Sequence, residues 1–192
     1  MEYVRLGRTG LKVSRICLGC MTFGNRADWM VDGEGAKRVL KRAWDLGINF
    51  YDTANVYSNG KSEELLGEFL SGMRDDAVVA TKVRGEMGPG PNQQGLSRAH
   101  ITWQVGESLR RLKTDRIDLY QIHRWDYETP IEETLSTLTD LVRSGKVRYI
   151  GASSMWAWQF TKALYTSDMK GYERFASMQN LYNLLYREEE GR

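Results

Sequence analysis

The chain has 192 residues, of which 41% are hydrophobic and 27% charged, with a formal net charge of +2. These values are typical of one globular domain with a substantial core, and the charge is too small to indicate binding to nucleic acid or an anionic membrane. No apolar run approaches the ~18 residues of a membrane span, and the N-terminus has no signal-peptide core, so we expect a single cytoplasmic domain over residues 1–192.

Short apolar strands alternate with helices along the whole chain. Six strands are expected, in segments 14–21, 48–52, 77–82, 116–123, 147–153 and 175–180. Helices are expected between them, over residues 34–47, 62–72, 97–113, 129–146 and 156–167. Ser62 is predicted to cap the second helix, and Thr129 with Pro130 to begin the fourth. The first helix is predicted to bury one apolar face, made of Ala36, Val39, Leu40, Ala43 and Leu46.

Alternating strands and helices indicate parallel strands joined by right-handed crossovers. The strands are continuously apolar, as expected when both faces of a sheet are covered. Two architectures fit this pattern, a doubly wound open sheet and a (β/α) barrel. A dinucleotide-binding open sheet normally carries G-x-G-x-x-G after its first strand, whereas here the first strand leads into GCMTFGNRADW. The sequence therefore favours the barrel.

The two cysteines form a C-x-x-C pair, Cys17 and Cys20, within an apolar strand. A zinc site needs more than two ligands, and redox pairs of this kind lie in loops or at helix starts. We therefore interpret both cysteines as unpaired structural thiols and expect no metal site. His100 is expected to be an exposed helix residue.

Polar side chains stand at the C-terminal ends of five successive strands. They are Asp52, Lys82, His123, the pair Ser153 and Ser154, and the pair Gln179 and Asn180. In a barrel these ends converge on one mouth, where catalytic residues lie. One polar residue at a strand end is often only a solvated terminus, but five such ends together predict a functional ring.

Tyr57 follows Asp52 by five residues, in the loop over the same mouth. An unperturbed phenol has a pKa of ~10, and a nearby ammonium group favours the phenolate form. An aspartate would keep the ammonium of Lys82 charged and oriented, and His123 would donate a hydrogen bond to a substrate oxygen. These four residues make a proton donor suited to a carbonyl that gains negative charge. Reduction of that carbonyl would need a hydride from a cofactor.

Long segments of the chain resemble the aldo-keto reductase family, among them GINFYDTANVYSNGKSEELLGEFL and SLRRLKTDRIDLYQIHRWD. The resemblance covers the whole chain and implies a (β/α)8 TIM-type barrel with an N-terminal β-hairpin on its floor, here YVRLGRTGLKVS. It also implies NADPH-dependent reduction of small aldehydes and ketones to alcohols. The catalytic tetrad of the family falls on Asp52, Tyr57, Lys82 and His123, with Tyr57 as the general acid.

The resemblance further implies a cofactor site and a substrate pocket. Trp125 and Tyr127 are candidates for the substrate pocket, although surface packing explains them equally well. The residues expected to contact NADPH or NADP are Gly19, Cys20, Met21, Asp52, Ser153, Ser154 and Gln179.

The sequence departs from the family because it reaches Arg192 after six of the eight barrel strands, and such barrels typically need about 250 residues. We expect an incomplete barrel that lacks the C-terminal β/α units. Its open edges should lead the chain to associate with itself, to recruit the missing piece from elsewhere or to stay partly molten. Two alternatives to the reductase stay open, an inactive truncated fragment and a cofactor-sensing module like the channel auxiliary subunits of this fold. Those subunits carry Asn at the fourth tetrad position, so His123 favours the enzyme.

Overall fold

The computed structural model describes residues 1–188 and centres on one parallel sheet. Its six strands pair in chain order: β3 (Leu18–Gly19), β4 (Phe50–Asp52), β5 (Val78–Val83), β6 (Ile117–Ile122), β7 (Val147–Ser153) and β8 (Met178–Gln179). Five α-helices connect them: α1 (Gly33–Asp45), α2 (Lys61–Phe69), α3 (Arg98–Leu112), α4 (Ile131–Arg143) and α5 (Ala157–Lys170).

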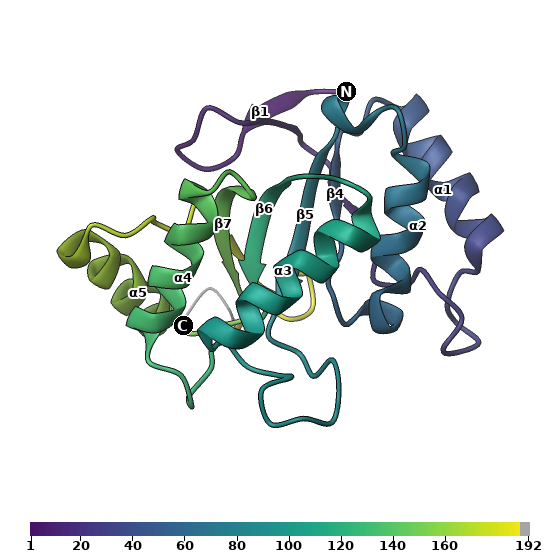
Figure 1. The fold of residues 1–192 in the computed structure, drawn as a ribbon. Coiled ribbons are helices and arrows are strands. Elements are labelled where there is room, and N and C mark those ends of the chain that lie inside the picture. The colour runs from purple at the N-terminus through teal and green to yellow at the C-terminus, as the bar shows by residue number, and fades with distance from the viewer. Residues whose placement is uncertain (189–192) are drawn as a thin grey trace.

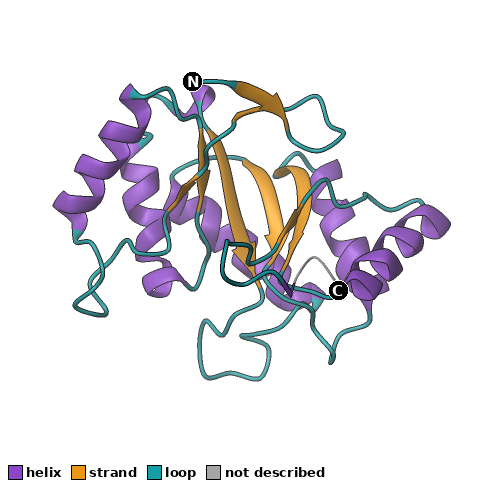
Figure 2. Cartoon of the chain, turned by 180° about the vertical axis from the view of Figure 1, so that it is seen from behind, coloured by secondary structure: helices purple, strands orange, loops and turns teal. Residues whose placement is uncertain are grey.

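The helices lie along one face of the sheet (Figure 1), whereas no helix of residues 1–188 covers the opposite face, which Figure 2 shows from behind. This arrangement is an open half of a (β/α) barrel, with the helices outside and the barrel interior on the uncovered face. The prediction of an incomplete barrel with six parallel strands is confirmed.

An antiparallel hairpin lies across the N-terminal ends of the parallel strands (Figure 1). It consists of β1 (Tyr3–Arg5) and β2 (Lys12–Ser14). Ser14 and Asn49 fasten it to the start of β4, because each backbone N–H donates to the side chain of the other, at 2.6 Å from Ser14 and 3.2 Å from Asn49. The predicted hairpin at the barrel floor is therefore confirmed.

The core lies between the sheet and the helices. β5 and β6 are buried along their whole length, and Val79, Ile101 and Tyr120 are fully buried in the main apolar cluster. Helices α2 and α3 approach closely at Gly67, where an added Cβ atom would lie 2.6 Å from the carbonyl carbon of Leu112. The glycine therefore sets the distance between these two helices.

The sheet has two open edges, since β3 and β8 each pair with only one strand. A groove beside β3 is lined by Leu18, Ile48 and one side of α1. Val39 and Leu46 of α1, which we predicted to be buried, are 39% and 49% exposed in this groove. That prediction is wrong for these two residues because no described element packs on their side of the helix. It is correct for the other three, Ala36, Leu40 and Ala43.

Two predicted helix starts are also wrong. The N-cap of α2 is Gly60, with φ of +91°, and the hydroxyl of Ser62 instead donates to the carbonyl of Cys20 at 2.7 Å. The hydroxyl of Thr129 donates to Asp126 Oδ2 at 2.8 Å and does not cap α4. Both hydroxyls thus fasten loops, which local sequence patterns do not indicate.

Within the described part of the chain, none of the helices has the length and apolar character that crossing a bilayer requires.

Candidate active site

A buried ion pair joins the ends of β4 and β5. Lys82 is 2% exposed, and its Nζ donates to Asp52 Oδ1 and, at 2.9 Å, to the carbonyl oxygen of Thr53. The ion pair is possible because the strands are parallel neighbours, with Asp52 opposite Ala80 in the register. The carboxylate and the carbonyl replace the water that the ammonium loses on burial.

Tyr57 lies on the loop that follows β4, in the short 3-10 helix η1 (Tyr57–Gly60). The Lys82 ammonium donates to its phenol oxygen at 3.3 Å and lies 5.0 Å from the ring centroid. The loop is fastened by Ser58, which donates to the carbonyl of Phe23 at 3.0 Å. At Gly24 the space is tight, since an added Cβ atom would lie 2.1 Å from Ser58 Oγ.

His123 follows β6 directly and faces the phenol. Its backbone N–H donates to the carbonyl of Val83 at 2.9 Å, and its ring meets the Tyr57 ring edge-on, with 5.7 Å between centroids. Burial, followed by the charges of Lys82, Arg124 and Arg84, lowers the pKa of His123 from 6.5 to about 4. The imidazole is therefore neutral at pH 7 and offers one N–H donor.

Gln121 completes the site and was missed in the sequence. It is 2% exposed, and its Nε2 donates to Asp52 Oδ2 at 3.0 Å and to Gln179 Oε1 at 3.3 Å. The signal that indicates it is the period of two in a strand, because residues 121 and 123 project to the same side of β6. Gln121 thus holds the second oxygen of the carboxylate that binds Lys82.

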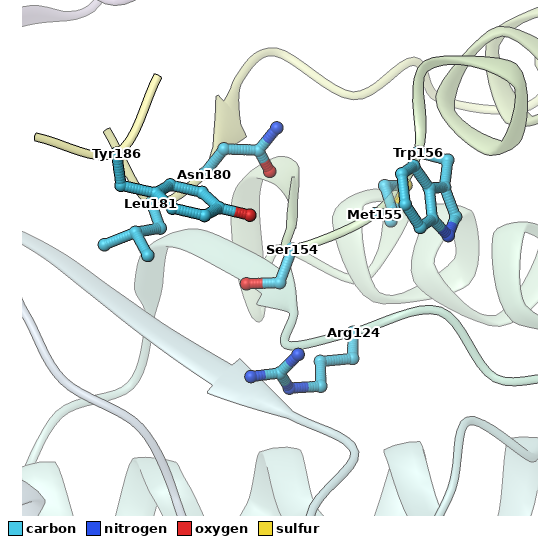
Figure 3. A pocket seen from close by; sticks show the side chains of 7 residues that line it. All are labelled: Arg124, Ser154, Met155, Trp156, Asn180, Leu181 and Tyr186. Atoms are coloured by element: carbon cyan, nitrogen blue, oxygen red, sulfur yellow. The ribbon is translucent and has the colours of Figure 1, made fainter. Parts of the chain in front are cut away.

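The predicted cofactor residues at the ends of β7 and β8 lie together. Ser153 Oγ donates to the carbonyl of Gln179 at 2.9 Å, and the Ser154 N–H donates to the same oxygen at 3.1 Å. Beside them is a pocket in which Ser154, Asn180, Arg124 and Tyr186 surround an open space (Figure 3).

These groups match the needs of a carboxamide such as that of nicotinamide, which both donates and accepts hydrogen bonds. Asn180 Oδ1 is buried and has no hydrogen-bond partner among the described residues, and Ser154 presents a hydroxyl to the same pocket (Figure 3). An amide N–H is the type of donor that such an orphaned oxygen lacks. The residues present therefore fit a nicotinamide group.

The three predicted cofactor residues after the first strand lie at the opposite edge of the sheet. Gly19 ends β3, and Met21 is 52% exposed. Cys20 is fully buried, and its N–H donates to the carbonyl of Asp52 at 2.8 Å, so it fastens β3 to β4. Burial raises the pKa of the Cys20 thiol, and both cysteines are free thiols, as predicted.

Other candidates from the sequence lie outside this group. Trp125 contacts Trp158, with ring centroids 6.1 Å apart, and Tyr127 is 71% exposed. His100 is fully buried, so the prediction of an exposed residue is wrong; the loop between β5 and α3 packs against it, as the influence of Asn92 and Gly85 on its pKa indicates. Residues 1–188 contain no group of three side chains arranged to hold a metal ion.

Comparison with known proteins gives consistent matches. The model of the Aldo/keto reductase family matches residues 15–192. Similar curated proteins include an aldo-keto reductase of Metarhizium robertsii, 46% identical over 99% of this chain and 59% of the relative. A putative aryl-alcohol dehydrogenase of Saccharomyces cerevisiae and the versiconal hemiacetal acetate reductase of Aspergillus parasiticus are each 43% identical, over 99% of this chain and 62% of the relative. The chain thus spans about three fifths of the length of these relatives.

Proposed function

The chain belongs to the aldo/keto reductase family, and from this premise we propose that it forms the proton-donating part of an oxidoreductase that reduces aldehydes and ketones to alcohols with NADPH. One observation carries the proposal. A buried lysine donates both to the carboxylate of Asp52 and to the phenol of Tyr57, and the neutral imidazole of His123 meets the ring of that phenol edge-on.

Tyr57 is the general acid in this proposal. As a carbonyl oxygen gains negative charge, the phenol O–H donates its proton to that oxygen, and the adjacent Lys82 ammonium stabilises the phenolate that remains. Asp52 prevents the ammonium from turning away, and Gln121 holds Asp52 in place. The hydride for the carbonyl carbon is what the nicotinamide cofactor supplies when it is bound.

His123 orients the substrate. A protonated imidazole would compete with Tyr57 as the proton donor and would add a third charge beside Lys82. The low pKa of His123 keeps the ring neutral at pH 7. Its N–H then donates a hydrogen bond to the carbonyl oxygen and aligns it with the phenol.

The cofactor would be held by residues at both edges of the sheet. Ser154 and Asn180 offer side-chain groups for the carboxamide of nicotinamide, and Gln179 lies beside them at the end of β8. On the other edge, Gly19 ends β3 and Met21 follows it, and both residues are exposed to a ligand.

The test is the substitution Tyr57→Phe, which removes only the acidic hydroxyl. Reduction of an aromatic aldehyde should fall by at least ~100-fold, the low end for general acid catalysis. NADPH affinity, measured by fluorescence titration, should change little because the phenol is not among the proposed cofactor contacts. Tyr165→Phe is the matched control, since this tyrosine is 65% exposed on α5, away from the site. Near-normal turnover in the Tyr57→Phe variant would show that another group donates the proton.

A further inference from the structure

Two arginines without carboxylate partners flank His123. Arg84 follows β5, and Arg124 follows His123 itself. Within residues 1–188, neither guanidinium lies within 4.0 Å of a carboxylate, whereas the partly buried Arg74 and the buried Arg111 each form such an ion pair, at 2.7 and 2.6 Å. The two cations at the mouth are therefore available to a ligand.

The backbone places Arg84 beside His123. β5 and β6 are parallel neighbours with Val83 opposite Ile122, so the next residue of each strand, Arg84 and His123, leaves the sheet at the same place. Arg84 has φ of +147°, a conformation that costs free energy for a residue with a side chain. Its carbonyl accepts a hydrogen bond from the Gly95 N–H at 2.8 Å, which helps to hold this backbone.

The side chain of Arg84 has an unsatisfied donor. Its Nε is buried and has no hydrogen-bond partner among the described residues. A buried donor without an acceptor costs ~1–3 kcal/mol, and here it occurs on a strained residue beside the catalytic imidazole. The unsatisfied donor is explained if a ligand supplies the acceptor.

Arg124 approaches the mouth from the other side. Figure 3 shows its guanidinium directed into the pocket that Ser154 and Asn180 also line. The charges of Arg124 and Arg84 both act on His123, after burial and Lys82, in lowering the pKa of the imidazole. Arg84 leaves the sheet beside His123 and Arg124 directly follows it, so both side chains start next to a substrate that is bound at the imidazole.

The local positive charges are only partly balanced by the protein. The charge of Lys82 is neutralised by Asp52. The carboxylate of Asp126, in the loop after β6, is occupied by the Leu96 N–H at 2.7 Å and by the hydroxyl of Thr129 at 2.8 Å. The charge of Arg84 also acts on Asp126, as the last of the influences that lower the pKa of that carboxyl. Since neither Arg84 nor Arg124 forms an ion pair among residues 1–188, the mouth keeps an excess of positive charge in a partly buried place, which favours an anion.

We propose that Arg84 and Arg124 bind an oxyanion on the substrate, a carboxylate or a phosphate, and that the enzyme prefers aldehydes that carry such a group. Guanidinium groups bind these anions through paired hydrogen bonds with defined geometry. The anion would anchor one end of the substrate while His123 and Tyr57 bind the carbonyl oxygen at the other. This inference rests on the proposed reductase function.

The first experiment measures substrate preference. We would compare kcat/KM for 4-formylbenzoate with that for its neutral methyl ester, and glyceraldehyde 3-phosphate with glyceraldehyde. The wild-type chain should prefer the anionic member of at least one pair by ~10-fold or more, and the pair that shows it identifies the anion. Arg84→Gln and Arg124→Gln should each reduce this preference by at least ~10-fold. Arg38→Gln, on the exposed side of α1, should leave it unchanged. Equal kcat/KM within both pairs would overturn the proposal and leave the reductase function intact.

The second experiment does not depend on turnover. Benzoate and inorganic phosphate are titrated calorimetrically into the cofactor-free chain. At least one should bind to the wild type and to Arg38→Gln, and should bind at least ~10-fold more weakly to the double variant of Arg84 and Arg124. If the chain reduces no aldehyde, the proposed function fails while this titration still decides the anion site. The proposal would be overturned if the wild type and all variants bound benzoate and phosphate equally. It would also be overturned if the double variant lost affinity for NADPH but not for either anion.

Discussion

Acidification should destabilise the chain through His123, and His123→Gln should remove that effect. The pKa of His123 lies at about 4 in the folded chain because the imidazole is buried and because Lys82, Arg124 and Arg84 are close. In the unfolded chain the imidazole has its ordinary pKa of 6.5. Between these two values the unfolded state binds a proton that the folded state does not, so folding becomes less favourable as pH falls.

The size of the effect follows from the two pKa values. Because one unit of pKa corresponds to ~1.4 kcal/mol, the full difference amounts to ~3 kcal/mol below pH 4. The stabilisation is complete above pH 6.5 and declines as pH falls towards 4. At pH 5 the loss attributable to His123 is ~2 kcal/mol, which is a large fraction of the stability of an ordinary domain.

Urea denaturation at pH 7, 6 and 5 measures this. The free energy of unfolding of the wild type should fall by ~2 kcal/mol more than that of His123→Gln between pH 7 and 5, because all other groups titrate alike in both. Proton NMR gives a direct reading, since the chain has only two histidines and the variant identifies the His123 signal. An imidazole signal from His123 that titrates near pH 6.5, or parallel unfolding curves for the two proteins, would refute the reasoning.

Two further predictions concern packing and the open edges. Gly67→Ala should destabilise the chain by ~2 kcal/mol or more, because the new methyl group would press on the Leu112 carbonyl. Gly106→Ala is the control in another helix: no atom lies within 4 Å of the new Cβ, so this change should stabilise the chain by ~0.5–1 kcal/mol. Urea denaturation of both variants measures the two changes in the free energy of unfolding. Sedimentation velocity should show concentration-dependent association of the wild type, and Leu46→Lys, in the groove beside β3, should weaken it. A wild-type chain that stays monomeric at all concentrations would contradict the second prediction.

The sheet topology was predictable because it depends on features that repeat along the chain. Each apolar strand is followed by a helix, which indicates parallel strands, and the lack of G-x-G-x-x-G after the first strand favours the barrel, in which strands pair in chain order. The exposure of Val39 and Leu46 was not predictable in the same way. Helical periodicity shows that a face is apolar, but it does not show which element covers that face. His100 illustrates the converse, because the loop that leads into α3 folds back on it and buries it, and no local pattern marks that contact.

The predicted tetrad is brought together because its members share a structural position. Asp52, Lys82 and His123 stand at or just after the ends of adjacent parallel strands, and Tyr57 follows on the next loop. What the sequence did not indicate is how each group is held. Gln121 lies within a strand that was interpreted only as apolar, and Arg84 lies where a loop was expected to begin. Their importance comes from contacts between strands and from a strained backbone.

The residues around Tyr57 and the candidate cofactor residues lie in different parts of the sheet. The contacts that orient Tyr57 come from β4, β5 and β6, the middle of the described structure, where every strand has two neighbours. The candidate cofactor residues Gly19 and Gln179 lie on β3 and β8, the two open edges. Additional strands at those edges would change the surroundings of Gly19 and Gln179 far more than those of Tyr57. The preference for anionic substrates, which depends on Arg84 and Arg124 after β5 and β6, should therefore depend less on the edges than cofactor affinity does.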